Sequence, residues 1–243
     1  MEALPSGEVH VWVVRLGNDL SPDRVRACAA LLSADERERA ARFRFEGHRR
    51  AWIVAHALVR SALSHYAPVP PEAWTFRSER RGRPRIAGPS GAPGLRFNLS
   101  HSDRLAACAV ASELDVGVDV ESTARLHRPL EIAERYFAPE EARELRSLSG
   151  AERCERFLDY WTLKEAYVKA RGDGLSIPLD RMRFALGPEA GPQVSFHRSL
   201  SDEAADWQFE LREPCAGQRL ALAVHRPGRP DLAVQLRRGA PGA

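Results

Sequence analysis

"WTLKEAYVK", residues 161–169, holds both lysines of a 243-residue chain whose 36 Lys and Arg residues are otherwise all arginine. A similar stretch, "WIVAHALVR", stands at residues 52–60. Four residues recur at the same offsets, in the pairs Trp52/Trp161, Ala57/Ala166, Val59/Val168 and Arg60/Lys169. Matches at fixed spacing indicate an internal duplication. Where the first copy has Ala55 and His56, the second has Lys164 and Glu165, so only the second carries an acid there.

The sequence around each copy predicts the same order of elements. In the first half we expect a strand at 9–16, a helix with Ser21 as its cap and Pro22 at its first position, helices over 33–45 and 47–67, and strands near 74–77, 84–87, 95–99 and 105–111. In the second half we expect a strand at 114–121, helices over 138–148 and 151–172, the latter ended by Gly172, and strands near 182–186, 193–197, 206–212 and 219–225. Residues 87–94 and 187–192 are predicted loops, and the tail 237–243 is predicted to be loose. We therefore predict an α+β fold, a pseudo-two-fold duplication with halves 1–112 and 113–243.

Composition places the chain among ordinary globular proteins, with 44% hydrophobic and 28% charged residues. No apolar run approaches the length that spans a bilayer, and the N-terminus lacks a basic start followed by an apolar stretch. The four cysteines form no CxxC pair and lack histidines at zinc spacing, so free thiols are expected. These features predict a cytoplasmic protein without membrane contact.

Charge is distributed unevenly along the chain. Residues 1–112 carry 17 Arg against 11 Asp and Glu, a net charge of +6, whereas residues 113–243 carry 19 Lys and Arg against 22 Asp and Glu, a net charge of −3. The basic excess gathers at 36–50 and 77–85. Two interpretations fit these runs: solvated helix and loop faces, or a landing surface for a multiply charged anion or an acidic partner. The total of +3 is too small to indicate nucleic-acid binding.

The strand "LDVGVDVE", residues 114–121, presents carboxylates on one face. Side chains alternate along a strand, so Asp115, Gly117, Asp119 and Glu121 share the face opposite to the apolar residues. Gly117 leaves room there for something to approach. Two adjacent like charges are typical of a solvated edge or of a site bridged by a cation, and both interpretations fit.

The helix at 151–172 adds a third carboxylate and two ammonium groups. Glu165 and Lys169 are i,i+4 neighbours, a spacing that fits simple helix support. Together with the strand carboxylates, Glu165 would complete an all-oxygen site suited to Mg²⁺, with ammonium groups placed for a phosphate. Lys164 falls on the apolar side of the helix, where it must either snorkel to water or serve a buried anion.

The segment "RFNLSHSDR", residues 96–104, predicts a strand that runs into a turn. Adjacent Ser100 and His101 should point to opposite faces, which makes them a poor nucleophile–base pair. The turn suits a phosphate contact, and it fits equally well an ordinary Ser/Asp turn. The chain has no Walker loop and no dinucleotide-binding glycine fingerprint.

Four motifs in order, "GRP" (82–84), "FNLSHS" (97–102), "GVDVE" (117–121) and "WTLKEAYVKARGDGLSIPLD" (161–180), resemble those of Sfp-type 4'-phosphopantetheinyl transferases over at least residues 33–180. The resemblance implies a monomeric pseudo-dimer with one active site in the cleft between its halves. It implies transfer of the phosphopantetheine arm of coenzyme A to a carrier-protein serine, with release of 3',5'-ADP, in fatty acid, polyketide or non-ribosomal peptide synthesis.

The resemblance also implies roles for residues of the second half. The metal-binding carboxylates correspond to Asp119, Glu121 and Glu165, which would hold Mg²⁺. The conserved helix lysines correspond to Lys164 and Lys169, both counted with Glu165 among the catalytic residues, and Lys169 would lie near the transferred phosphate. Glu165 or a metal-bound water would take the proton from the carrier serine.

In the first half, the resemblance implies that Ser100 and His101 contact coenzyme A and that Arg39 and Arg83 hold its 3'-phosphate. The chain departs from the family where Glu36 replaces a lysine and Trp52 replaces a phosphate-contacting threonine. An acidic carrier surface would meet the Arg-rich first half.

Two rival functions belong to other classes. A non-catalytic coenzyme A or nucleotide-binding module would lack at least one of the three carboxylates, and none is missing. An RNA-binding protein would interleave exposed aromatic residues with its basic runs, which Phe43 and Phe45 do only weakly.

Overall fold

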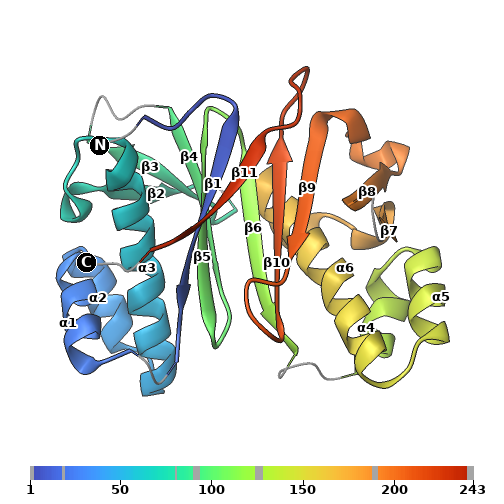
Figure 1. The fold of residues 1–243 in the computed structure, drawn as a ribbon, viewed down its shortest axis with the longest axis horizontal. Helices are drawn as coiled ribbons and strands as arrows, with labels where there is room; N and C mark the ends of the chain where they lie inside the picture. Colours follow the sequence, from blue (N-terminus) through green and yellow to red (C-terminus); the bar gives the residue numbers. More distant parts are fainter. Residues whose placement is uncertain are drawn as a thin grey trace. The chain divides into compact units, whose positions relative to one another are not determined.

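The computed structural model describes residues 3–17, 20–79, 81–89, 94–123, 128–187 and 191–239. The chain forms two units, each with its own helices, sheet and hairpin (Figure 1). The first unit comprises Met1–Val116 together with Leu232–Ala243, and the second comprises Gly117–Asp231. The C-terminal segment therefore belongs to the first unit, whereas the sequence placed it with the second half.

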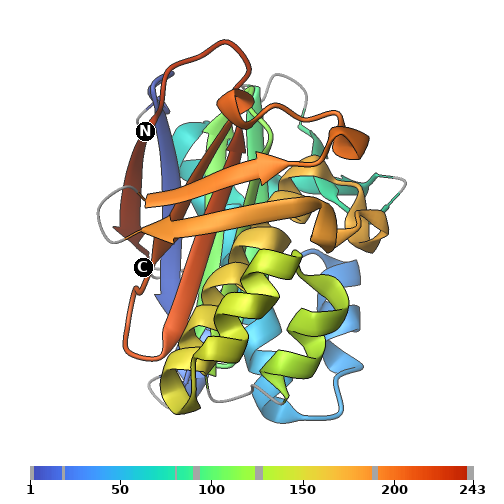
Figure 2. The ribbon, with the colours of Figure 1, turned by 90° about the vertical axis from the view of Figure 1, so that its right-hand side faces the viewer.

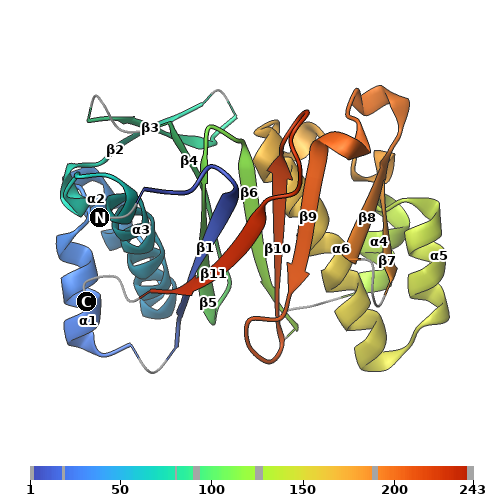
Figure 3. The same cartoon turned by 45° about the horizontal axis from the view of Figure 1, so that its top comes forward.

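The first unit packs one long helix on a four-stranded sheet. Its elements are β1 (Glu8–Arg15), α1 (Pro22–Ala30), α2 (Ala34–Ala41), α3 (Glu46–Tyr66), η1 (Pro71–Ala73), β2 (Thr75–Ser78), β3 (Pro84–Gly88), β4 (Leu95–His101), β5 (Leu105–Ser112) and β11 (Ala233–Arg238). The sheet order is β11-β1-β5-β4, with β11 parallel to β1 and the other pairs antiparallel. Strands β2 and β3 form a separate hairpin. Figure 3 shows β11 beside β1 at the sheet edge.

The helices of the first unit begin where local sequence satisfies their free N–H groups. Ser21 accepts a hydrogen bond from the backbone N–H of Arg24, and Pro22 opens α1, as predicted. Ser33 and Glu36 form a capping box at the start of α2. Helix α3 buries its apolar face on the sheet, with Val54 and Ala57 fully buried. Burial of this stripe is what holds the unit together.

The second unit repeats this arrangement. Its elements are β6 (Val116–Ser122), α4 (Pro129–Tyr136), α5 (Pro139–Ser147), α6 (Gly150–Arg171), η3 (Gly174–Ser176), η4 (Leu179–Arg181), β7 (Met182–Gly187), β8 (Gly191–Phe196), η5 (Arg198–Leu200), η6 (Ala204–Asp206), β9 (Trp207–Arg212) and β10 (Gln218–His225). The sheet order is β6-β10-β9, and β7 and β8 form a hairpin (Figure 2). Helix α6 packs on β10 and β9, as α3 packs on β5 and β4. Gly172 ends α6 at a φ of 73°, as expected.

Each unit thus runs strand, two short helices, long helix, hairpin and strand pair, which confirms the predicted duplication and α+β class. The matched alanines of the two copies, Ala57 and Ala166, are both fully buried.

One α-helix and one strand among the described elements were not predicted. Helix α4 has eight residues and begins at Pro129, so its amphipathic pattern spans only about two turns. Strand β11 lies at the start of the tail and pairs with β1 from the opposite end of the sequence, a non-local contact that no periodicity encodes. The predicted loops at 87–94 and 187–192 and the tail at 237–243 lie partly outside the described residues.

Glu36 joins α2 to α3 through a mostly buried ion pair with Arg60. Its carboxylate accepts hydrogen bonds from the backbone of Ser33 and from the side chain of Arg60, which is itself buried. His56 lies 3.4 Å away and stacks on Trp52. Burial of the carboxyl would raise its pKa, but the hydrogen bonds and the charge of Arg60 outweigh burial and bring the pKa of Glu36 down to about 2. The residue that departs from the family pattern is therefore an internal structural anion.

We expect Glu36→Gln to destabilise the protein strongly at pH 7 and little at pH 2. The carboxylate stabilises the fold above its unfolded pKa, near 4.5, and this contribution is lost as pH falls toward about 2, a difference of about 3 kcal/mol. Urea unfolding at the two pH values measures it. Glu38→Gln, at an exposed i,i+4 pair with Arg42 on the same helix, is the matched control and should show almost no effect. An equal loss at both pH values would contradict the assignment.

Candidate active site on strand β6 and helix α6

Strand β6 turns its acidic face toward α6. Asp119 is buried at 4% exposure, and its Oδ1 atom lies 2.6 Å from the Nζ atom of Lys169. Glu121, two residues along, accepts a hydrogen bond from the side chain of Trp161. The predicted alternation along this strand is therefore observed, with both carboxylates directed at the same helix.

Gly117 allows the helix to lie this close. A Cβ atom at this position would stand 2.0 Å from the carbonyl oxygen of Ala166 and 2.5 Å from the backbone nitrogen of Ala170. Ala166 and Ala170 directly follow Glu165 and Lys169 in the sequence, so Gly117 lies against the part of α6 that carries these two polar residues. The room expected at Gly117 is taken by the backbone of α6.

The carboxylates act on one another electrostatically. Burial, together with the charges of Asp119 and Glu165, raises the pKa of Glu121 to about 7, against the lowering effects of Trp161 and Lys169. Burial and the charge of Asp119 also raise the pKa of Glu165, and Lys169 opposes this. The three acids thus form one coupled group with one ammonium in contact.

The chemistry of this donor set fits a hard divalent cation, because it offers only carboxylate oxygens and their mutual repulsion would be relieved by positive charge. Within the described ranges, however, no three or more His, Cys, Asp or Glu side chains are grouped so that they could hold a metal ion as they stand. In this structure the ammonium of Lys169 supplies the positive charge at Asp119.

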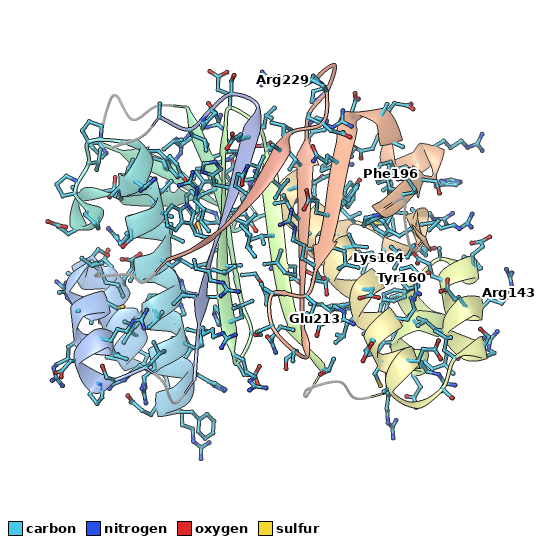
Figure 4. All side chains as sticks on the ribbon, in the orientation of Figure 1. Arg143, Tyr160, Lys164, Phe196, Glu213 and Arg229 are labelled. Carbon is cyan, nitrogen blue, oxygen red and sulfur yellow. The ribbon has the colours of Figure 1, made fainter. Side chains whose placement is uncertain are left out.

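Lys164 lies on a different face of α6 and is fully buried. Its Nζ atom is 2.8 Å from Oε2 of Glu141, 2.9 Å from the carbonyl oxygen of Leu179 and 2.6 Å from that of Met182. Three acceptors therefore match the three N–H groups of an ammonium. Figure 4 shows Lys164 and Tyr160 projecting from α6 toward α5. Of the two roles considered for this lysine, the structure shows pairing with a buried anion.

Glu141 is anchored as completely as its partner. It accepts hydrogen bonds from the backbone N–H groups of Ala138 and Phe184, at 3.0 and 2.8 Å. Burial raises the pKa of Glu141 and lowers that of Lys164, while the charge of each partner opposes the shift of the other. The pair joins the start of α5, strand β7 and helix α6 within the second unit.

The predicted residues of the first unit lie on three elements. Arg39, on α2, lines an open hollow of about 700 Å³ and lies over the ring of Trp52, 5.9 Å from its centroid. Ser100 is buried and His101 exposed at the end of β4, so they point to opposite faces as expected.

Arg83, on the β2–β3 hairpin, is buried and donates to Asp115 at 2.9 Å. Arg85 donates to the same oxygen at 2.7 Å.

Sequence reasoning missed the partners of the predicted residues. Glu141 stands 23 positions before Lys164, and the only signal it gives is that of a helix start after Pro139. Trp161 was recognised as part of the repeat but not as a donor to Glu121. Asp115 was placed on the acidic face of its strand, without its arginine partners.

Comparisons with known proteins agree across the chain. The profile of the 4'-phosphopantetheinyl transferase superfamily matches residues 115–224, and a second profile, described as 4'-phosphopantetheinyl transferase, N-terminal, matches residues 20–114. The 4'-phosphopantetheinyl transferase HetI of Nostoc sp. is 40% identical over 76% of this chain and 77% of its own. The 4'-phosphopantetheinyl transferase Sfp of Bacillus subtilis is 28% identical over 91% of this chain and 94% of its own. The solved holo-[acyl-carrier-protein] synthase of Thermotoga maritima matches 46% of this chain and 64% of its own, with 24% identity and a TM-score of 0.38.

Gly117→Ala should displace α6 from β6 and lower the free energy of unfolding by about 3 kcal/mol or more. The added methyl group would overlap backbone atoms, which no side-chain rotation can move. Urea unfolding measures the loss. The control is Gly187→Ala, at the end of β7, where a Cβ atom meets nothing within 4 Å. Equal stability of the two variants would contradict the close approach.

Lys164→Met should lower the free energy of unfolding by about 3–5 kcal/mol, because it leaves Glu141 buried without its counter-charge. The double variant Glu141→Gln/Lys164→Met removes both charges and should be more stable than the single variant. Chemical unfolding of the three proteins checks this order. A double variant less stable than Lys164→Met would show that the pair is not the reason for the loss.

Proposed function

The chain belongs to the 4'-phosphopantetheinyl transferase superfamily, and from this membership and its acidic site we propose that it moves the 4'-phosphopantetheine arm of coenzyme A to a serine of an acyl or peptidyl carrier protein, releasing 3',5'-ADP. The observation that carries the proposal is the grouping of Asp119, Glu121 and Glu165 around the ammonium of Lys169. A non-catalytic binding module would not need three acids that repel one another, two on strand β6 and one on helix α6.

In this proposal Glu165 is the general base. Burial and the charge of Asp119 raise the pKa of Glu165 in the site without metal, whereas the charge of a bound Mg²⁺ would lower it. Glu165 therefore acts as the base through its position beside the reacting groups. It takes the proton of the carrier serine hydroxyl as the serine oxygen attacks the β-phosphorus of coenzyme A. The bond from this phosphorus to the bridging oxygen breaks, and the electron pair leaves with 3',5'-ADP.

Lys169 stabilises the charge on the transferred phosphate. Its side chain is 28% exposed, and its Nζ atom contacts Asp119. An ammonium suits a phosphate oxygen as a compact point charge.

Lys164 does not contact substrate in this proposal. Its three N–H groups are occupied within the protein, and it keeps α6 in place through Glu141. Its role is therefore that of a positioning residue.

Asp119, Glu121 and Glu165 would hold Mg²⁺, which would supply positive charge to the coenzyme A pyrophosphate when bound. The acids favour such a cation because, besides burial, the charge of Asp119 raises the pKa of both glutamates and the charge of Glu165 raises that of Glu121.

The partner is the carrier protein, whose acidic surface would meet the Arg-rich first unit. We also propose that the protein is a monomer and that it acts in the cytoplasm. All four cysteines are free thiols, which suits a reducing compartment. Among the described helices, none has the length and apolar character needed to cross a membrane.

Mass spectrometry of an apo carrier protein incubated with coenzyme A, Mg²⁺ and this protein should show addition of the phosphopantetheine mass. Asp119→Ala and Glu165→Gln should each lower the rate by about 100-fold or more, since each removes a group that acts in the transition state. Glu152→Gln, an exposed acid in the first turn of the same helix, is the matched control and should keep the wild-type rate. Carriers of several classes left unmodified by the wild-type protein would refute the proposal.

A further inference from the structure

A mostly buried carboxylate between β8 and β9 holds the end of α6. Asp202 lies between η5 and η6, and its side chain is 11% exposed. Its Oδ2 atom accepts a hydrogen bond from the hydroxyl of Tyr167 at 2.6 Å and another from Arg171. Its Oδ1 atom accepts one from the indole N–H of Trp207 at 3.1 Å. One side chain thus joins two positions of α6 to the first residue of β9.

The two helix residues are fixed further by contacts of their own. Tyr167 is fully buried, and its ring centroid lies 4.8 Å from that of Trp207 and 5.1 Å from that of Phe196, which Figure 4 labels. Arg171 donates to the carbonyl oxygen of Leu200 at 3.0 Å and to the hydroxyl of Tyr167 at 3.2 Å. The end of α6 is therefore held by aromatic packing, a hydrogen-bonded hydroxyl and an ion pair.

Lys169 stands between these two anchored residues in the sequence and on the other side of the helix. Tyr167 and Arg171 are four residues apart and share one face, whereas Lys169 is rotated by about 200° from each of them. Its Nζ atom is 2.6 Å from Oδ1 of Asp119 on β6. The last turn of α6 is therefore held on opposite sides, by β6 and by Asp202.

The end of a helix needs such an anchor, because terminal turns open more easily than the interior of a helix. Lys169 is the third residue from the end of α6, and Gly172 ends the helix in the left-handed conformation. The position of Lys169 therefore depends on contacts that hold this last turn from outside. A group that must face a phosphate in the transition state loses rate when it is displaced by about 1 Å.

We propose that Asp202 is a positioning residue for the transfer reaction: by holding Tyr167 and Arg171 it fixes the last turn of α6, and with it the place of the Lys169 ammonium. The inference rests on the proposed function, in which Lys169 stabilises the transferred phosphate. In this role Asp202 acts through the helix and makes no contact with substrate.

The alternative is that Asp202 only satisfies buried polar groups and so stabilises the second unit. Tyr167 and Trp207 are both buried and need hydrogen-bond partners, and the positive charge of Arg171 at a helix end is favourable in itself. Both roles predict a less stable protein without Asp202. They differ in the rate of the folded enzyme, because a residue that only stabilises would leave kcat unchanged.

Amide hydrogen exchange and steady-state kinetics distinguish the two roles. We expect Asp202→Ala to speed exchange at the amides of Ala170 and Gly172 about tenfold or more, beyond any change in the first half of α6. With coenzyme A, Mg²⁺ and an apo carrier, it should lower kcat about tenfold or more and change the KM for coenzyme A less than about twofold, since Lys169 acts in the transition state. Asp202→Asn keeps an acceptor for Tyr167 and should give intermediate values.

Asp159→Asn is the control matched to Asp202→Asn. Asp159 lies in the first half of the same helix and pairs at 2.7 Å with Arg219 of β10. Its side chain is 17% exposed, so the removed charge is nearly as buried as that of Asp202. This variant should also lose stability, but it should keep both kcat and the exchange rates at the end of α6.

Tyr167→Phe and Arg171→Gln each remove one contact of Asp202 and should lower kcat by smaller factors. Combined with Asp202→Ala, either change should add little, because residues that act through one contact are not additive. If Asp202→Ala fails to fold, these two single variants give the same two readouts.

An unchanged kcat in the folded variants would overturn the inference, and so would a loss of rate with normal exchange at the end of α6. A wild-type protein that modifies no carrier would refute the proposed function instead. Hydrogen exchange would then still decide whether Asp202 fixes the turn that carries Lys169.

Discussion

At Gly117 the backbone of β6 lies so close to α6 that a Cβ atom would stand 2.0 Å from the carbonyl oxygen of Ala166. This approach places Lys169 within 2.6 Å of Asp119 and brings Glu165 into the field of the same acid. The raised pKa values of the site follow from it, because each carboxylate is held near another with little water between them. The geometry of the site thus depends on backbone packing at Gly117, where the absence of a side chain lets β6 and α6 approach each other.

The two long helices differ in the ion pair that each makes at one matched position. Arg60 and Lys169 occupy matched positions on the two long helices, and each pairs with a carboxylate of its own unit. In the first unit that acid is Glu36, whose ion pair is mostly buried and serves the packing of α2 on α3. In the second unit the acid is Asp119, and the lysine remains partly open to solvent. The matched helix position therefore carries a structural ion pair in the first unit and, in the proposed function, a phosphate-facing cation in the second.

Features that depend on local sequence pattern could be predicted, whereas few features that depend on contacts between distant parts of the chain could. The caps at Ser21 and Gly172, the alternation along β6 and the repeated helix were all predicted, because each is fixed within a few residues. Strand β11 was not, since its partner β1 lies at the other end of the chain. Within the candidate site, the residue types were predictable from the motifs, but the assignment of Lys164 to Glu141 depends on how α5 packs on α6. No spacing along the helix contains that information.

The survival of two lysines in an arginine-rich chain has a physical explanation at each position. At 164 the cation is enclosed by Glu141 and two backbone carbonyl groups, with the rings of Phe137 and Phe184 at 5.2 and 5.9 Å. An ammonium fills this space with three donors, whereas a guanidinium would bring five donors in a plane and leave some without acceptors. At 169 the ammonium contacts Asp119 and the side chain is partly exposed, which suits a compact charge on a flexible stem. Elsewhere arginine makes contacts through two nitrogens at once, as Arg60 does with Glu36, and the two lysines stand where no such contact is made.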